Sequence, residues 1–328
     1  MLDMLSVVAF YAIATAAELE IFEILADEAR SSEALAQHIN IDEKGAIILL
    51  DVLEGLGYVR RKQKNGLVIF ANTPMASEWM ISTAKVNFAE GFKFFKVMAS
   101  QFLPELGASI QQGQPQRHLY EWLADQPEPS KIFQDWLAEG ARLAKEEVST
   151  KLTIQKENAR ILDLGGGHGV YSTTICRQYP DVTVTIYDSE LALKMATDQI
   201  MQENLASRIS IQAGDFIADD IGSDYDMVLL FNVIHGLSDV QIRGLIEKVK
   251  AALIPGGRIA ILEALSGRGP TKLLKTGTSL FSLLYYHTLG GKALRYEEIN
   301  ALLLEGGFSE VREMKLANVR GASLILAS

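Results

Sequence analysis

The chain has 328 residues, of which 48% are hydrophobic and 22% charged, so it is long enough to bury a full core and to form two domains. Its formal net charge of −10 opposes a nucleic-acid interface, which needs a basic face to displace counterions. A single cysteine, Cys176, excludes an internal disulfide and a cysteine-rich zinc site, and we expect no metal.

The first segment, Leu2 to Ala17, is very apolar and predicts a helix. It carries few charges, so we expect it to pack on another surface, for which a second subunit is a candidate. Met1 to Glu23 contains no Lys or Arg and holds four acids, unlike a signal peptide, and the apolar run Met4 to Ala17 is too short to span a membrane. These features predict a soluble protein in a reducing, cytoplasmic compartment.

Short helices followed by a β-hairpin are predicted next. The helices cover Glu20 to Leu25, Ser32 to His38 with Ser31 or Ser32 as cap, and Glu43 to Leu56 with Asp42 as cap and Gly57 at the end. The hairpin pairs Tyr58–Arg61 with Leu67–Phe70 through Asn65-Gly66, a dipeptide favoured in two-residue turns. Three helices and a hairpin together predict a winged-helix domain.

Winged-helix domains often bind DNA, but the charges of this one oppose that role. The helix in the recognition position holds the acids Asp42, Glu43, Asp51 and Glu54 against the single base Lys44, and these acids would repel phosphates. The hairpin is basic, with Arg60, Arg61, Lys62 and Lys64. We therefore favour a scaffold for dimerisation and keep a winged-helix regulator as the less favoured alternative.

Residues 75 to 152 are predicted to be helical, with breaks at Pro104, at Gly113-Gln114-Pro115 and at Pro127-Glu128-Pro129. The polar stretch Thr153 to Asn158 then marks a domain boundary. The expected domains are therefore residues 1–152 and 153–328.

The second domain is organised around Arg160 to Gly169, an apolar strand that runs into a glycine loop. Gly165, Gly167 and Gly169 allow sharp turns with positive φ and let a bulky ligand approach the main chain. The following residues, Val170 to Gln178, predict a helix whose free N–H groups face the same place. The loop is therefore a candidate cofactor site.

Two classes of nucleotide cofactor bind to loops of this kind, and the spacing of the glycines distinguishes the two. A dinucleotide loop has the pattern G-x-G-x-x-G, whereas here the third glycine is Gly169 and Val170 follows. Asp163, near the end of the strand, would repel a pyrophosphate and favours a cationic group beside the loop. A sulfonium with an amino-acid tail fits this loop better than NAD does.

Two further strand ends supply other parts of the candidate site. The strand Val182 to Tyr187 ends in Asp188, 23 residues after the first glycine of the loop, near the spacing of an acid that holds ribose hydroxyls. The strand Ile209 to Gln212 leads to Asp215 and Phe216, an acid and a ring that can hydrogen-bond and stack on an adenine.

The remaining strands bring two ionisable residues to the same edge. Asp226 to Ile234 predicts a buried strand followed directly by His235, and Arg258 to Leu262 likewise ends in Glu263. Ligands of open parallel sheets bind beyond the carboxyl ends of the strands, so both side chains should face the cofactor crevice. Helices are predicted over Thr271–Leu289 and Tyr296–Glu305, and further strands over Val311–Met314 and Ala322–Leu326. With these two strands the prediction is a doubly wound, mostly parallel seven-stranded sheet.

These ordered blocks resemble a known family. LDLGGGHG, the Asp188 strand, AGDF and FNVIHGLSD, followed by PGGRIAILEA and GGKALRYEEINALLLEGGF, are similar to those of class I S-adenosylmethionine-dependent methyltransferases, and look like the plant-type small-molecule O-methyltransferases and their bacterial relatives. The resemblance covers residues 160 to 328. It implies an α/β, Rossmann-like catalytic domain over 153–328, preceded over 1–152 by a mainly helical winged-helix domain that dimerises and caps the substrate.

The resemblance also assigns single residues. The cofactor S-adenosylmethionine would lie against Asp163, Gly165, Gly167, Asp188, Asp215 and Phe216. In the family a His at the place of His235 is the general base, oriented by acids, one of which matches Glu263. The second acid falls at Ala293, the usual His-Asp pair reads His235-Gly236, and Asp239 matches the later acid of that motif.

We therefore expect a homodimer that methylates a hydroxyl of a small aromatic or polyketide-like metabolite, without nucleic-acid or membrane partners. Because one carboxylate is lost, methylation of carbon or nitrogen, or a reaction that uses the bound cofactor mainly as a positive charge, is the alternative. His168 can contact the cofactor or face solvent, while His38, His118 and His287 are expected to be structural or exposed. The acceptor depends on side-chain packing that the sequence does not reveal.

Overall fold

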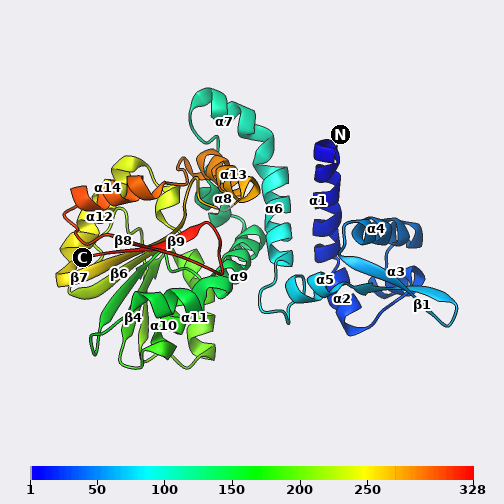
Figure 1. The fold of residues 1–328 in the computed structure, drawn as a ribbon, viewed down its shortest axis with the longest axis horizontal. Helices are drawn as coiled ribbons and strands as arrows, with labels where there is room; N and C mark the ends of the chain where they lie inside the picture. The colour runs from blue at the N-terminus through cyan, green and yellow to red at the C-terminus, as the bar shows by residue number, and fades with distance from the viewer. Residues whose placement is uncertain (1, 270) are drawn as a thin grey trace. The chain divides into compact units, whose positions relative to one another are not determined.

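The computed structural model describes residues 2–269 and 271–328 and divides into two compact units (Figure 1). Unit 1 holds the chain up to Pro104 together with 131–140, and unit 2 holds 105–130 and 141–328. The long helix α9 (Pro127–Leu152) contributes residues to both units. The single boundary at residue 152 stays a prediction, because these units follow helix packing and not one cut in the chain.

The predicted winged-helix domain is present in unit 1. Its elements are α1 (Leu2–Glu18), α2 (Ile21–Asp27), α3 (Ser32–Ile39), α4 (Glu43–Gly55), β1 (Val59–Lys64) and β2 (Leu67–Asn72), followed by α5 (Pro74–Trp79) and α6 (Ala89–Gln101). Ser31 and Asp42 cap α3 and α4, where their side chains accept from the amides of Ala34 and Gly45. A buried core that includes Phe22, Leu50 and Phe70 holds these elements together.

The hairpin forms as predicted, with Asn65 and Gly66 at φ values of 52° and 77° in its turn. Its register pairs Val59 with Asn72 and Lys64 with Leu67. Arg61 is held by ion pairs of 2.6 Å to Asp51 and of 2.6 Å to Glu54 of α4. One charge of the basic hairpin is thus already neutralised by the acidic helix beside it.

Helix α1 was expected to be too short for a membrane span. Within the part of the chain that the structure describes, no helix by itself has the length and apolar composition to cross a membrane. The stretch Met4–Glu18 passes that test only together with α2, at a bend of 58° between them.

A seven-stranded sheet forms the centre of unit 2, as predicted (Figure 1). In spatial order the strands are β5 (Ile209–Ala213), β4 (Thr183–Asp188), β3 (Arg160–Leu164), β6 (Tyr225–Phe231), β7 (Leu253–Ala264), β9 (Ala322–Ala327) and β8 (Arg312–Lys315). The strands β3 to β7 pair in parallel, and β9 is antiparallel to β7 and β8. The strand order changes direction between β3 and β6, which places a ligand crevice at the carboxyl ends of these two strands.

Helices cover both faces of this sheet (Figure 1). α10 (Val170–Gln178) and α11 (Glu190–Gln202) lie on one face, and α12 (Asp239–Ala252) and α14 (Tyr296–Glu305) lie on the other. Alternate strand residues such as Leu162, Leu164 and Val228 pack with Leu245 of α12 and Leu303 of α14 in one core. Unit 2 also contains α7 (Leu106–Gln112), α8 (Leu119–Ala124) and α13 (Lys272–Leu289).

One local prediction was wrong. The strand predicted over 226–234 ends at Phe231, because Asn232 adopts a left-handed φ of 56° that no strand contains, and η2 (Ile234–Gly236) follows. His235 therefore lies on a short 3-10 turn and not directly at the strand end. The helix break predicted at Pro127-Glu128-Pro129 is confirmed, because α8 ends at Ala124 and α9 begins at Pro127, where proline in a first helical turn lacks only an amide that has no helical partner.

Candidate active site

The glycine loop after β3 packs too tightly for side chains. Gly165 has a φ of 72°, and a Cβ on it would lie 2.7 Å from the side chain of Val233. A Cβ on Gly166 would lie 2.6 Å from the carboxyl group of Asp163. Glycine is therefore required here for the loop to pack against Val233 and Asp163.

Asp163 lies beneath the loop, with only 1% of its surface exposed. The hydroxyl of Ser172 on α10 donates to its Oδ2 at 2.5 Å. Burial raises the pKa of Asp163 to about 6, an effect that the Ser172 hydrogen bond opposes and the nearby charge of Asp188 reinforces. The side chain thus ties the loop to the first helix of the sheet, next to the place expected for the cofactor.

Asp188 reaches the same loop from the end of β4. Its Oδ2 accepts from the amide of Gly167 at 2.9 Å, and its Oδ1 accepts from the amide of Ser189 at 2.6 Å. Burial raises the pKa of Asp188, although both amides favour the charged form. Each oxygen has a second lone pair, so the carboxylate is oriented and can still accept from a pair of ligand hydroxyls.

Asp215 and Phe216 follow β5 and have different surroundings. Asp215 is exposed, and its Oδ1 accepts from the amide of Ile217 at 2.9 Å. The ring of Phe216 meets that of Tyr187 edge-on at 6.3 Å and lies 3.9 Å from the place of a Cβ on Gly165. The structure thus brings Phe216 beside the glycine loop, where a flat ring can stack.

Asp219 was missed in the sequence, because it lies in the loop after Phe216 and belongs to no strand end. Its Oδ2 accepts from the hydroxyl of Tyr187 at 3.1 Å and from the amide of Asp215 at 2.9 Å. It therefore fixes the course of the chain that carries Asp215 and Phe216.

His235 and Glu263 are in direct contact. Nδ1 of His235 lies 2.8 Å from Oε2 of Glu263, and the amide of His235 donates to Oε1 of the same carboxylate at 3.3 Å. Both side chains are enclosed, with residue exposures of 8% for His235 and 2% for Glu263. The carboxylate thus fixes the imidazole through its Nδ1, which leaves Nε2 as the proton-accepting nitrogen.

One face of the His235 imidazole is covered by the ring of Tyr285 from α13. The ring centres are 3.9 Å apart and the planes are inclined by 24°. Tyr285 falls in the helix predicted over Thr271–Leu289, where a tyrosine is more often part of the core than of a site. Its contact with His235 depends on the packing of α13 against η2.

A second phenol, that of Tyr120 on α8, is within electrostatic range of the same carboxylates and was missed in the sequence. Desolvation by the surrounding protein raises its pKa most, followed by the charges of Asp188 and Glu263, although 49% of the residue's surface is exposed. The pKa of Tyr285 is raised by burial, by Glu263 and by Tyr120. The two phenols therefore lie within electrostatic range of the carboxylates at both ends of the site and stay protonated at neutral pH.

The other histidines have structural surroundings or face solvent. Nδ1 of His168 accepts from the amide of Val170 at 3.1 Å, and burial and Arg142 lower its pKa to about 4. His287 is buried and contacts the hydroxyl of Ser109 at 2.8 Å, whereas His38 is exposed. Ala293, which stands at the place of the family's second acid, is buried. Asp239, which matches the later acid of the histidine motif, is exposed in the first turn of α12.

The described residues contain no group of three or more His, Cys, Asp or Glu side chains that could hold a metal ion.

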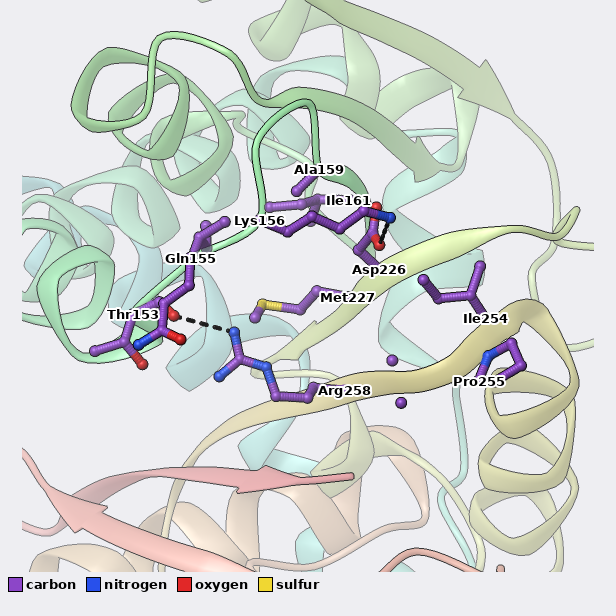
Figure 2. A pocket seen from close by; sticks show the side chains of 13 residues that line it. Thr153, Gln155, Lys156, Ala159, Ile161, Asp226, Met227, Ile254, Pro255 and Arg258 are labelled. Atoms are coloured by element: carbon purple, nitrogen blue, oxygen red, sulfur yellow. Dashed lines mark hydrogen bonds and ion pairs between the residues drawn. The ribbon is translucent and has the colours of Figure 1, made fainter.

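A separate cavity of about 500 Å³ lies at the amino ends of β3, β6 and β7 (Figure 2). Its polar side chains have partners within unit 2, because Arg258 donates to the carbonyl of Thr153 at 3.2 Å and Lys156 pairs with Asp226 at 2.5 Å. It includes none of the predicted site residues. The candidate site is the one at the opposite, carboxyl edge.

Comparison with known proteins gives consistent matches along the chain. Residues 101–309 match the model of the O-methyltransferase domain, and residues 3–82 match that of the O-methyltransferase dimerisation domain. The chain is 26% identical to acetylserotonin O-methyltransferase of Bos taurus over 311 residues, which cover 90% of this chain and 88% of that protein. It is also 26% identical to 3-hydroxy-5-methyl-1-naphthoate 3-O-methyltransferase of Streptomyces sahachiroi over 322 residues, which cover 95% of this chain and 89% of that protein.

Solved structures agree with the fold. Human N-acetylserotonin methyltransferase in complex with S-adenosylmethionine has a TM-score of 0.88 and 21% identity, covering 99% of this chain and 95% of that one. Mitomycin 7-O-methyltransferase has a TM-score of 0.84 and 19% identity, covering 99% of this chain and 95% of that one. The predicted fold and the predicted family resemblance are thus confirmed, together with S-adenosylmethionine as the cofactor of that family.

The buried carboxyl of Asp163 predicts a pH dependence of stability. Its pKa is about 6 in the folded chain against an ordinary 3.8, so between these values the folded chain holds a proton that the unfolded chain has lost. Its stabilising contribution is present below pH 4 and lost as the pH rises through 6. Asp163→Asn keeps an oxygen for Ser172 but cannot ionise, so its free energy of unfolding relative to the parent should rise by about 1–3 kcal/mol from pH 4 to pH 7.

Urea unfolding of both proteins across this pH range measures the difference. Asp181→Asn is the matched control, because Asp181 is exposed at the opposite end of β4. Its difference from the parent should be constant with pH. A constant difference for Asp163→Asn as well would show that Asp163 is ionised in the folded chain throughout the range.

Proposed function

The chain belongs to the O-methyltransferase family, and on that premise we propose that it transfers a methyl group from S-adenosylmethionine to a hydroxyl of a small aromatic or polyketide-like metabolite, with His235 as general base. The observation that carries the proposal is the 2.8 Å contact between His235 and Glu263 at the carboxyl edge of the sheet. Two relatives are named for methyl transfer to oxygen on acetylserotonin and on a hydroxynaphthoate, and we extend this kind of acceptor to the present chain.

The residues at the carboxyl edge fit the cofactor. The glycine loop packs without side chains against Val233 and Asp163, and Asp188 presents an oriented carboxylate for two ribose hydroxyls. Phe216 lies beside the loop, in a place where it can stack on an adenine, and Asp215 can accept from a hydrogen-bond donor there. S-adenosylmethionine supplies, when bound, an electrophilic methyl group on a positively charged sulfur.

The acid–base role falls to His235. Glu263 accepts the Nδ1 proton, so the neutral imidazole presents an unprotonated Nε2, which has no hydrogen-bond partner among the residues that the structure describes. A phenol has a pKa of about 10, so only about one molecule in a thousand is ionised at pH 7, whereas an ordinary imidazole can take its proton near that pH. Glu263 then stabilises the imidazolium that forms, as the buried acid of a hydrolase triad does.

Tyr285 supports this role as a positioning residue. Its ring covers one face of the His235 imidazole at 3.9 Å, which restricts rotation of the imidazole about the bond to its Cβ. An aromatic face also stabilises a cation by about 0.5–2 kcal/mol. The stack therefore favours the orientation in which the base receives the proton and stabilises the imidazolium that forms during the reaction.

We further assign dimerisation and substrate capping to residues 1–152 and cofactor binding to residues 153–328. The exposed apolar side chains of α1 support a homodimer, because Met4, Leu5, Val7 and Val8 are each more than half exposed in the single chain. The match of residues 3–82 to the dimerisation domain agrees with this assignment. A cytoplasmic, reducing compartment suits the single buried thiol of Cys176.

A second candidate function is methylation of carbon or nitrogen, or a reaction that uses the cofactor mainly as a charge. It is favoured by Ala293, a buried apolar residue at a place where the family resemblance expects an acid. Because that second acid is missing, Glu263 is the one carboxylate of the pair that orients the imidazole. A winged-helix regulator is disfavoured, since Arg61 of the hairpin is already paired with Asp51 and Glu54.

Replacement of Asp188 tests the cofactor site. Asp188→Ala should weaken binding of S-adenosylmethionine by about tenfold or more, because each hydrogen bond to a charged group contributes on the order of 1.5–3 kcal/mol. Isothermal titration calorimetry measures the affinity. Asp181→Ala, at an exposed position two residues before β4, should bind like the parent. A folded Asp188→Ala protein that binds as tightly as the parent would remove Asp188 from the site.

Replacement of His235 tests the base. In single-turnover methyl transfer at saturating substrate, His235→Ala should lower the rate by about 10²–10⁴-fold with little change in cofactor affinity, and Glu263→Gln should lower it less. His38→Ala is the control, because His38 is exposed on α3. If His235→Ala binds both ligands and keeps nearly the full rate, the second candidate function becomes the better description.

Replacement of Tyr285 separates positioning from packing. Tyr285→Phe keeps the ring and should retain the rate of methyl transfer, whereas Tyr285→Leu should lower that rate by about 3–10-fold with little change in cofactor affinity. Single-turnover methyl transfer at saturating substrate gives the rate, and isothermal titration calorimetry gives the cofactor affinity. An unchanged rate in Tyr285→Leu would show that the stack has no influence on the base.

A further inference from the structure

A second hollow lies at the carboxyl edge of the sheet, on the far side of β7 from the cofactor strands. It has a volume of about 660 Å³ and lies between the loop that joins β7 to α13 and the loop that joins β8 to β9. Four cationic side chains line it: Arg268, Lys275, Lys315 and Arg320. We call it the basic hollow. All of its residues belong to unit 2.

The charge of the basic hollow is opposite to that of the chain. The chain has 41 acids against 31 Lys and Arg, yet no acid is among the residues that line this hollow. Arg268 is neutralised by Glu313 at 2.8 Å. Lys275, Lys315 and Arg320 have no acid within 4.0 Å among the residues that the structure describes. Three uncompensated positive charges therefore surround one hollow.

Like charges gathered in this way repel one another, and a bound anion removes the repulsion. A monovalent anion would leave most of the positive charge in place. A phosphoryl group carries up to two negative charges and three acceptor oxygens, which suits several Lys and Arg donors at once. The charge pattern therefore points to a phosphate and not to a simple carboxylate.

The shape of the hollow depends on glycine and on a buried apolar floor. Gly269 and Gly321 have φ values of 132° and 100°, and a Cβ on Gly269 would lie 2.8 Å from Cβ of Leu274. The floor includes Leu316 and Ala322, which are 5% and 8% exposed. A volume of this size is in the range of small-molecule sites, and an apolar floor suits an organic body attached to the anionic group.

Hydrogen bonds to the side chain of Glu147 and between backbone groups fix the two loops of the hollow. The amides of Ala317 and Asn318 donate to the carboxylate of Glu147 on α9, at 2.9 and 3.0 Å. The amide of Leu265 donates to the carbonyl of Gly321 at 2.9 Å, which fastens the two loops together. Because the loops are fixed before any ligand arrives, binding requires little ordering of the main chain.

We propose that the basic hollow is a binding site for a small organic phosphate, with Lys275, Lys315 and Arg320 as the groups that hold the phosphoryl oxygens. Lys275 and Tyr285 are ten residues apart on α13, so the hollow lies about 15 Å along that helix from the ring stacked on His235. This separation makes it distinct from the site of methyl transfer and from the loop proposed for the cofactor.

Inorganic pyrophosphate is the probe, titrated into the full chain by calorimetry at low salt and followed by thermal unfolding. The parent should bind it with a Kd on the order of 1 mM or tighter and should unfold at a higher temperature in its presence. Lys275→Ala/Arg320→Ala should bind at least tenfold more weakly, because two charged donors are lost. Pyrophosphate should no longer raise the unfolding temperature of this double variant. Without ligand, the double variant should be as stable as the parent.

Lys62→Ala/Lys64→Ala is the matched control, since it removes two exposed lysines from the hairpin and gives the same net charge. It should bind pyrophosphate like the parent. The proposal fails if the parent does not bind pyrophosphate or if both double variants weaken binding equally. It also fails if the parent sediments with phosphatidylglycerol vesicles but does not bind pyrophosphate, because the hollow would then serve a lipid surface.

Saturating S-adenosylhomocysteine separates this inference from the proposed function. Pyrophosphate binding should be unchanged by it, because the two ligands occupy different parts of the sheet edge. Competition between them would place pyrophosphate in the cofactor loop and overturn the separate site. Loss of methyl transfer in the His235 variant has no bearing on this result.

Discussion

The chemistry at the carboxyl edge of the sheet depends on the carboxylate of Glu263, which makes two contacts with His235. Glu263, at the end of β7, accepts from the backbone amide of His235 and contacts the Nδ1 atom of its ring. The two bonds fix both the 3-10 turn that carries the histidine and the direction of the imidazole. Tyr285 then closes one face of the ring, so that Nε2 is the part of the base left to act. A buried carboxylate of this kind is stable only with such partners, and this requirement links the fold to the chemistry.

The other acids of the edge are controlled by the same physical rule with different results. Asp188 keeps two backbone amides and remains within reach of a ligand, whereas Asp163 is buried beneath the glycine loop and bonded to Ser172. Burial raises the pKa of both, but the number of amide donors differs, so one carboxylate suits ligand binding and the other ties the loop to α10. Beyond β7 the charge at this edge is positive, because cationic side chains line the basic hollow although the chain as a whole carries a net negative charge.

Much of the fold and part of the site could be read from the sequence because strand ends carry local signals. The glycine loop, Asp188 and Glu263 each follow an apolar run, and in a parallel sheet such positions meet at one edge. The prediction for His235 was right in its contact with Glu263 but wrong in its local structure, because a left-handed Asn232 ends the strand early. The helix break expected at Pro127 is present, since α8 ends at Ala124 and the proline begins α9.

Periodicity and residue order by themselves determined the winged helix, the seven-stranded sheet and the set of acids at its edge, because these depend on contacts between neighbours in sequence or on strands of regular length. Only the tertiary structure decided that Tyr285 stacks on His235, that Asp219 holds the chain that carries Asp215 and Phe216, and that Arg268, Lys275, Lys315 and Arg320 surround one hollow. These groups come from helices and loops far apart in the chain. Their meeting depends on how side chains pack between elements, which no local pattern in the sequence encodes.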